Sequence, residues 1–319
     1  MDVLSDAITA MRTGRPHASR QHRAGTWGIR FEAGHGIGFH AVLDGEVWLH
    51  PPGGTAPVRL QPGDLVLLPH GGGYALSDQP ASPLHAARLT PDGRLRPQPP
   101  LADPADATSA TLCGAYLFDQ ARPHPLLAEL PPHLRLTTGD GRHPRLRSVV
   151  DLLADELAEQ RPGADALLPA LLDALLLHVL RAWYAEHREI TGWARALHDQ
   201  PVGTALRALH EDPAHPWTVE ELGTVAGLSR AAFARRFTTL VGQPPLAYLT
   251  WWRMTLAGHL LRSTDSPLRT VAHRTGYLSE FAFAKAFKRE YGSSPGRYRT
   301  ASRPVGGDEQ PEPVTGTVG

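Results

Sequence analysis

Residues 226–237 read AGLSRAAFARRF, and residues 277–287 read YLSEFAFAKAF. The first stretch contains a turn glycine, Gly227, and another, Gly276, directly precedes the second stretch. In both, a serine follows the glycine, and two phenylalanines four residues apart follow the serine. Glycine ends a helix because it adopts the left-handed backbone conformation without steric cost, and a serine side chain caps the next helix. Each stretch therefore predicts a helix-turn-helix whose second helix buries its phenylalanines.

The residues around both stretches complete two such units. Thr218 and Glu221 form the sequence pattern of a capping box, which satisfies backbone N–H groups at a helix start. Residues 266–269 open the corresponding helix of the second unit, and a long amphipathic helix from about Pro245 to Arg262 joins the two units. One helical hairpin with a glycine turn is a weak signal, but two in tandem are specific.

The joining helix GQPPLAYLTWWRMTLAGHLL (242–261) and the second unit VAHRTGYLSEFAFAKAFKREYGSSPGRYR (271–299) resemble the DNA-binding domain of the AraC/XylS family of bacterial transcription regulators. The resemblance extends over about residues 203–300. It implies that both second helices enter successive major grooves of double-stranded promoter DNA. It also favours an activator over a repressor, with RNA polymerase as the protein partner of an activator.

The outward faces of the two second helices supply the candidate DNA contacts. Recognition helices present their N-terminal residues to base edges, where arginine donates to guanine and small residues pack on thymine methyl groups. The candidate base-reading residues are Arg230, Ala231, Ala234, Arg235, Glu280, Phe281, Ala284 and Lys285. The candidate phosphate contacts are Arg236, Lys288, Arg289, Arg297 and Arg299. Arg235 is the first choice for base readout. Glu280 either accepts from cytosine N4 or only favours the helix start.

The charge distribution agrees with an anionic partner for the C-terminal third. The 319-residue chain has no net charge, but the segment 203–303 holds 14 Lys and Arg against 7 Asp and Glu. The rest of the chain is therefore as acidic as this segment is basic. Almost all the basic residues are arginine, which a GC-rich genome also explains, so the placement of the arginines carries more information than their number.

The remaining composition indicates a soluble globular protein. Its one cysteine, Cys113, excludes an intrachain disulfide. No signal-peptide pattern opens the sequence, and proline and aspartate interrupt the most apolar segment, 166–180. We therefore expect a cytoplasmic protein that does not bind membranes. Cys113 is either a buried inert thiol or a reactive thiol beside His124.

The N-terminal part changes to short apolar runs between glycines and prolines. Residues 3–12 predict a short helix. The segment 36–50, GIGFHAVLDGEVWLH, predicts a hairpin that turns at Asp44-Gly45, and a second turn is expected at Pro62-Gly63. Further strand candidates lie at 84–89 and 109–118. Closely spaced short strands predict a sandwich or small barrel.

This region resembles the cupin family in its spacing, but with two metal ligands replaced. The first cupin motif is matched by Gly34, His40, Glu46 and Gly53, and the second by Gly63, Pro69 and Gly71. Val42 and Tyr74 stand where two of the four ligands belong. A metal site therefore lacks donors, and we predict no metal and no cofactor. The candidate effector pocket consists of His40, Glu46, Trp48 and Tyr74, although these side chains could also only fill the core. A metal-dependent cupin enzyme fused to a DNA-binding domain is the alternative.

A leucine-rich helical pattern connects the two parts. Its apolar stripe from Leu168 to Trp183 is wide enough to require cover on two sides, by burial under the β domain, by a homodimer seam, or by both. The sequence thus predicts a multidomain α+β chain: a cupin-like β-barrel over 1–144, a helical connector over 145–202, an all-α tandem helix-turn-helix domain over 203–301 and a disordered tail over 302–319. The expected function is that of an effector-controlled, non-enzymatic transcription regulator acting as a homodimer.

Overall fold

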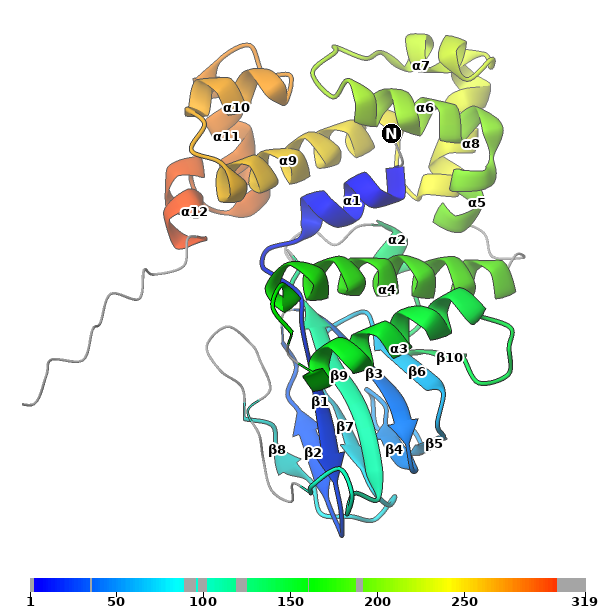
Figure 1. The fold of residues 1–319 in the computed structure, drawn as a ribbon. Helices are drawn as coiled ribbons and strands as arrows, with labels where there is room; N and C mark the ends of the chain where they lie inside the picture. The colour runs from blue at the N-terminus through cyan, green and yellow to red at the C-terminus, as the bar shows by residue number, and fades with distance from the viewer. Residues whose placement is uncertain are drawn as a thin grey trace, which may run out of the picture.

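The computed structural model describes residues 3–34, 36–88, 96, 102–118, 125–159, 161–187 and 192–302. Ten strands form a two-sheet β sandwich, a layer of two helices covers one of its faces, and a helical C-terminal part lies beyond that layer (Figure 1). The predicted order of a β-rich N-terminal part followed by two helix-turn-helix units is confirmed.

The two sheets have five strands each. The first sheet has the order β1 (His17–Arg23), β9 (Ser109–Tyr116), β3 (Ile37–Asp44), β6 (Asp64–Leu68) and β10 (Leu134–Thr137), with every neighbouring pair antiparallel. The second has the order β5 (Val58–Leu60), β4 (Val47–His50), β7 (Tyr74–Ser77), β2 (Gly28–Phe31) and β8 (His85–Ala86). Alternate residues of β3 point to opposite faces, so Phe39 packs toward the helices while Val42 packs between the sheets.

The predicted hairpin at Asp44-Gly45 is wrong. Strand β3 pairs with β9 and β6, whereas β4 pairs with β5 and β7, so the chain crosses from one sheet to the other at this turn. The register shifts between Val42 and Asp44, which marks a bulge, and bulges bend a strand away from its neighbour. Gly45 is required here: its φ is 71°, and a Cβ atom would lie 2.0 Å from the carbonyl oxygen of Thr108.

The helical layer consists of α3 (Pro144–Glu159) and α4 (Ala164–Glu186), and the predicted break at 161–163 is confirmed. It lies on the outer face of the first sheet (Figure 1). By length and mean hydropathy α4 resembles a membrane span. Most of its apolar stripe is instead buried within this chain: Leu172, Leu175, Leu176, Val179, Leu180 and Trp183. Intramolecular burial therefore explains most of the stripe, with Leu168 and Leu171 half-buried.

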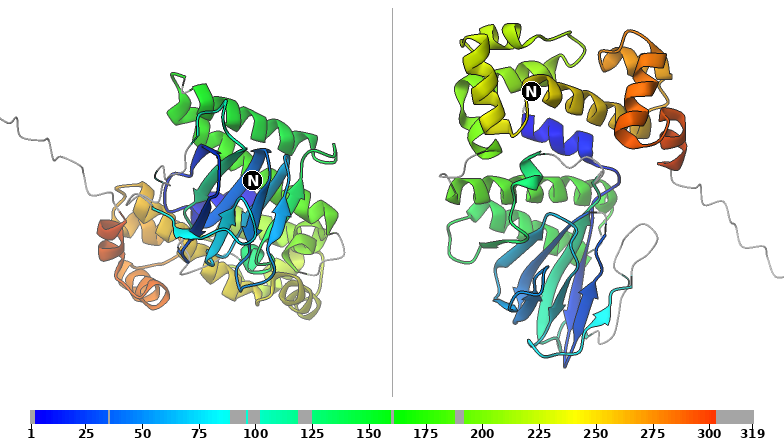
Figure 2. Two further views of the ribbon diagram at one scale, coloured as in Figure 1. Left: turned by 90° about the horizontal axis from the view of Figure 1, so that it is seen from below. Right: turned by 180° about the vertical axis from the view of Figure 1, so that it is seen from behind.

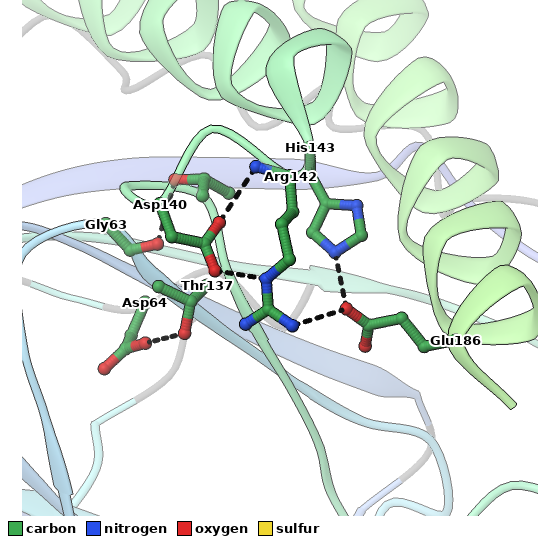
Figure 3. Close-up of polar contacts among 8 residues, drawn as sticks. Gly63, Asp64, Thr137, Asp140, Arg142, His143 and Glu186 are labelled. Atoms are coloured by element: carbon green, nitrogen blue, oxygen red, sulfur yellow. Dashed lines mark hydrogen bonds and ion pairs between the residues drawn. The ribbon is translucent and has the colours of Figure 1, made fainter.

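Polar contacts fix the C-terminal end of α4 to the loop before α3 (Figure 3). The His143 Nε2 atom lies 2.9 Å from Glu186 Oε1, and the Arg142 guanidinium lies 3.7 Å from the same oxygen. The Arg142 backbone N–H and Nε both donate to Asp140. In a separate contact of the same close-up (Figure 3), the Thr137 hydroxyl of β10 donates to Asp64 of β6 at 2.8 Å, which joins these two strands.

The N-terminal helix α1 (Val3–Met11) lies between the helical layer and the C-terminal part (Figure 1). It confirms the predicted short helix, and six of its residues are buried: Val3, Leu4, Ala7, Ile8, Ala10 and Met11. On one side it packs on α6 and α9 of the C-terminal part. On the other, Arg12 directly after the helix forms an ion pair with Asp173 of α4. The N-terminus therefore bridges the two halves of the molecule.

The C-terminal part contains the two predicted units. Its helices are α5 (Trp193–His198), α6 (Gln200–Glu211), α7 (Val219–Val225), α8 (Arg230–Val241), α9 (Pro245–Ser263), α10 (Leu268–Arg274), α11 (Glu280–Tyr291) and α12 (Pro295–Ala301). The long joining helix α9 is confirmed and links the unit of α7 and α8 to that of α10 and α11 (Figure 2, right). A short helix, α2 (Pro125–Ala128), precedes β10.

Candidate DNA-reading surface and effector pocket

Both helix-turn-helix units have the local geometry that their sequences predict. Gly227 and Gly276 end the first helices with φ of 68° and 77°, in the left-handed region. Ser229 and Ser279 cap the second helices by accepting from backbone N–H groups three residues on. The paired phenylalanines are completely buried: Phe233 and Phe237 in α8, and Phe283 and Phe287 in α11. Burial of one face fixes which residues of each second helix face outward.

Helix α8 presents the predicted base-reading residues to solvent. Arg230, Ala231 and Arg235 are exposed, and Ala234 is half-buried beside them. In the described part of the chain, no carboxylate pairs with the guanidinium of Arg230 or Arg235. An unpaired, exposed guanidinium keeps all its N–H donors for an external acceptor such as guanine O6 and N7 or a phosphate.

Arg236 differs from the prediction of a phosphate contact. Its Nε donates to Asp199 Oδ1 at 3.0 Å and its Nη2 to Oδ2 at 2.5 Å. The same carboxylate caps α6 by accepting from the backbone N–H of Val202 at 3.1 Å. The hydrogen bond from Arg236 is the main reason that the pKa of Asp199 is lowered. Arg236 therefore holds α8 against the start of α6, with the Nε and Nη2 donors of its guanidinium taken up by Asp199.

Helix α11 presents a different outward set. Glu280, Phe281 and Lys285 are exposed, with Ala284 half-buried. Of the predicted phosphate contacts, Lys288, Arg289 and Arg297 are exposed, although Arg289 also bonds the neighbouring Glu290 at 3.0 Å. Arg299 is a correction: it is half-buried, and its Nη2 donates to the carbonyl of Ser266 at 2.5 Å. It joins α12 to the residues before α10 instead of projecting toward DNA.

The β sandwich contains a cavity of about 590 Å³ at the end nearest α4. Its inner wall comes from β3, β7 and β9 through His40, Tyr74 and Cys113, and α4 contributes Leu168 and Pro169 at one side. A volume of this size is typical of small-molecule sites. The cavity therefore lies between the two sheets and the first turns of α4.

His40 and Tyr74, which the sequence places in two different motifs, meet in this cavity. The His40 Nε2 atom lies 2.8 Å from the Tyr74 hydroxyl, and Phe31 stacks on Tyr74 with ring centroids 4.7 Å apart. Complete burial lowers the pKa of His40 to about 3 and raises the pKa of Tyr74. Both rings are therefore neutral near pH 7. The buried Nδ1 of His40 has no hydrogen-bond partner among the described residues, so a bound molecule could supply one.

Cys113 lies on β9 directly opposite His40 and lines the same cavity. Burial raises the pKa of its thiol, although Thr111, 3.5 Å away, and Arg23 oppose this shift. Because the thiolate is the reactive form, burial makes this cysteine a poor nucleophile. The second residue of the proposed reactive pair, His124, lies outside the described residues.

Two predicted pocket residues are not in the cavity. Glu46 lies on the turn between the sheets, where it is exposed and forms an ion pair with Arg59. Trp48 is half-buried on β4 and faces away from the inter-sheet core that Val47 and Leu49 enter. Because β4 belongs to the second sheet and points Val47 and Leu49 into the core, the alternate residues Glu46 and Trp48 point away from it. Of the three other cupin ligand positions, two hold Val42 and Tyr74, and Glu46 is not in the cavity, so the residues present do not fit a cupin metal.

Sequence reasoning also missed part of the cavity. Gly38 lies under Tyr74, and a Cβ atom there would be 2.8 Å from the tyrosine hydroxyl. A glycine inside a buried strand signals such a close approach, so the sequence did contain this clue. The lining also includes Arg15, Glu32 and Asp165, which come from three distant segments and share no sequence pattern.

Comparison with known proteins agrees with this architecture. Residues 2–185 match the cupin family, and residues 222–301 match a helix-turn-helix domain. A putative AraC-like transcription regulator of Streptomyces antibioticus is 35% identical over 308 residues, which cover 95% of this chain and 100% of that protein. One from Streptomyces lividans is 36% identical, with 94% of this chain and 98% of that protein covered.

Among solved structures, the DNA-binding domain of AdpA, a global transcriptional factor in complex with a target DNA, is 37% identical. The match covers 33% of this chain and 94% of that one, with a TM-score of 0.31. From the family matches and the two full-length relatives, the chain belongs to the AraC family of transcription regulators and combines a cupin domain with a tandem helix-turn-helix domain.

Proposed function

We propose that this regulator is controlled by an uncharged, largely apolar molecule that binds in the cavity of the β sandwich. The observation that carries the proposal is the buried His40–Tyr74 pair, which lines a cavity of about 590 Å³ and leaves His40 Nδ1 without a partner among the described residues. Neutral side chains at its inner end disfavour a charged ligand group, because a buried charge needs a compensating partner. The charged residues among the lining are Arg15, Glu32 and Asp165, so cationic and anionic groups are both present there.

On the DNA side, we propose that α8 and α11 enter successive major grooves of promoter DNA. Arg235 and Arg230 read bases from α8, and Lys285 does so from α11, while Lys288 and Arg297 contact phosphates. The exposure of these side chains and the matching caps and cores of the two units support this assignment. The protein then acts as an activator in the cytoplasm with RNA polymerase as its partner.

The coupling between cavity and DNA runs, in this proposal, through α1 as well as the helical connector. Arg15 and His17 line the cavity a few residues after α1 ends. The Arg262 guanidinium of α9 donates to the carbonyls of Ala10 and Arg12 at 2.9 and 3.0 Å. A ligand that favours one position of α1 or of the α4 start therefore shifts the C-terminal units between two states.

A second contact joins α1 to the first unit. His210 of α6 is buried, stacks on Trp252 with centroids 3.9 Å apart and lies 2.7 Å from the Tyr248 hydroxyl. Its Nδ1 faces Asp6 of α1 at 3.6 Å. Burial lowers the pKa of His210, and the Asp6 carboxylate opposes that shift. This contact gives α1 a defined position on the joining helix, which a transmitting element requires.

We also propose that the protein is a homodimer through its helical layer. Leu152 of α3 and Leu167 of α4 are 54% and 46% exposed. Large apolar side chains that remain exposed on the helical layer support an association surface there. Two reading units in each copy then give four DNA contacts per dimer.

In vitro selection from random DNA with the full chain tests the DNA assignment. We expect a site with two information-rich elements. Arg235→Ala should weaken binding by about 1–3 kcal/mol and lose selectivity at one base position. Arg161→Ala, which removes an exposed arginine from the turn before α4, is the matched charge control and should change nothing. A uniform, sequence-independent loss with Arg235→Ala would make this residue a phosphate contact.

The effector proposal is tested with a pair of fluorescent probes that differ in charge. Neutral N-phenyl-1-naphthylamine should bind saturably to the wild type, and its sulfonated analogue should bind far more weakly. Gly38→Leu, which places side-chain atoms against Tyr74, should abolish binding of the neutral probe. Equal binding of both probes, or no effect of Gly38→Leu, would refute a neutral ligand site in this cavity.

A further inference from the structure

The turn of the second helix-turn-helix unit exposes two large apolar side chains. Leu278 is 95% exposed and Phe281 is 81% exposed, which makes them the most exposed large apolar side chains among the described residues. Leu278 directly precedes the N-cap residue Ser279, and Phe281 lies in the first turn of α11, so both side chains are exposed at the N-terminal end of this helix. We call this pair the apolar turn.

The local fold does not need the apolar turn. Tyr277 fills the inward position of the turn and contacts Phe283, with ring centroids 5.8 Å apart. The core of the unit is already filled by Phe283 and Phe287, which are completely buried. The second turn is one residue longer than the first, and Leu278 is the additional residue. The first unit places the small Ala231 at the position of Phe281, so the two units differ here.

The charges around the apolar turn favour DNA as its occupant. Lys285, Lys288 and Arg289 follow on the exposed side of α11, and this surface continues the proposed reading face. Glu280 lies between the two apolar residues in sequence, and its carboxylate is repelled by phosphates. The turn therefore fits over base edges better than over the sugar-phosphate backbone. In the major groove, the apolar group on a base edge is the thymine C5-methyl group.

We propose that Leu278 and Phe281 read thymine methyl groups, so that the second unit selects its half of the site by apolar contact. The proposal rests on the placement of α11 in a major groove. Leu278 is then a specificity residue that lies before the helix itself. The two units use different chemistry on one scaffold: guanidinium hydrogen bonds from α8, and methyl contacts from Leu278 before α11 and Phe281 in its first turn.

Replacement of single thymines by deoxyuridine tests the proposal, because it removes only the methyl group. On the selected site, we expect one or two thymines in the second element at which uracil weakens wild-type binding about 4-fold, the effect of one buried methyl-sized group. In Leu278→Ala or Phe281→Ala, the same replacement should change binding less than 2-fold, which closes a double-mutant cycle. Leu246→Ala, at an exposed leucine of α9, is the control and should keep the wild-type response.

The outcomes separate this inference from the proposed function. A two-element site whose second element is insensitive to uracil in the wild type would overturn the methyl contact and leave the placement of α11 intact. A selected site with only one element would overturn the placement itself. Unchanged DNA affinity in Leu278→Ala with reduced transcription would assign the apolar turn to a protein partner and would also overturn the inference. Both side chains are exposed, so thermal melts should show that the variants fold.

Discussion

The neutral state of His40 predicts a specific loss of stability in mild acid. In the folded protein, burial lowers the pKa of His40 to about 3 from an ordinary value of 6.5. Below pH 6.5 the unfolded chain therefore binds a proton that the folded chain does not bind. Proton binding to the unfolded state favours unfolding, so the contribution of His40 to stability falls as the pH drops.

The size of this loss follows from the two pKa values. Between pH 7.5 and pH 5.0 the unfolded imidazole becomes almost fully protonated, while the folded imidazole stays neutral. At about 1.4 kcal/mol per pH unit over the roughly 1.5 units below pH 6.5, the loss is about 2 kcal/mol.

Urea unfolding at the two pH values measures the loss, with His40→Gln as the control. Glutamine keeps a polar side chain but cannot titrate in this range, so the wild type should lose about 2 kcal/mol more than the variant between pH 7.5 and 5.0. The comparison removes the contribution of the other histidines. Carbon-13 NMR of the ring provides a direct check. A titration midpoint near 6.5 in the folded protein would refute a neutral, buried His40 and the argument for an uncharged ligand.

Three further changes probe the cavity and its link to the DNA-binding part. Gly38→Ala should destabilise the protein by about 1–3 kcal/mol in a thermal melt, because the new Cβ atom would lie 2.8 Å from the Tyr74 hydroxyl. Gly139→Ala is the control: its Cβ atom would meet only ordinary contacts, so the melting temperature should not change. Cys113 should react with Ellman's reagent at pH 8 at least ~100-fold more slowly in the native protein than in urea, because burial raises the pKa of its thiol. A rapid reaction of the native protein would instead indicate an accessible thiol. Arg262→Ala should speed amide hydrogen exchange in α1 by about 10- to 100-fold, because a charged hydrogen bond contributes about 1.5–3 kcal/mol. Unchanged exchange would show that the bonds from Arg262 to the carbonyls of Ala10 and Arg12 do not couple α1 to α9.

The parts of the fold set by local chemistry could be predicted from the sequence. Capping residues, turn glycines and phenylalanines four residues apart act within one or two helical turns, so the two reading units and the joining helix α9 were predictable. The break before α4 was predictable for the same reason, because Pro162 and Gly163 act on their own backbone. These features need no knowledge of distant partners.

The parts that depend on distant contacts could not be predicted. The Asp44-Gly45 turn has the composition of a hairpin, but Thr108 and the paired strands decide which sheet each arm joins. That choice turned Glu46 away from the cavity. Arg236 and Arg299 resemble other surface arginines in sequence, yet each has an acceptor 37 or 33 residues away. These contacts join residues that are far apart in the sequence, so no periodic pattern in the sequence indicates them.

Hydroxyl-radical footprinting of the full chain on its selected site tests the central claim most directly. If α8 and α11 enter successive major grooves, protection should fall in two windows on one face of the DNA, separated by about 10.5 base pairs. Arg235→Ala should weaken the window of the first unit, and Lys285→Ala should weaken that of the second. A single window, or continuous protection that does not depend on sequence, would contradict a regulator that reads DNA with two helices.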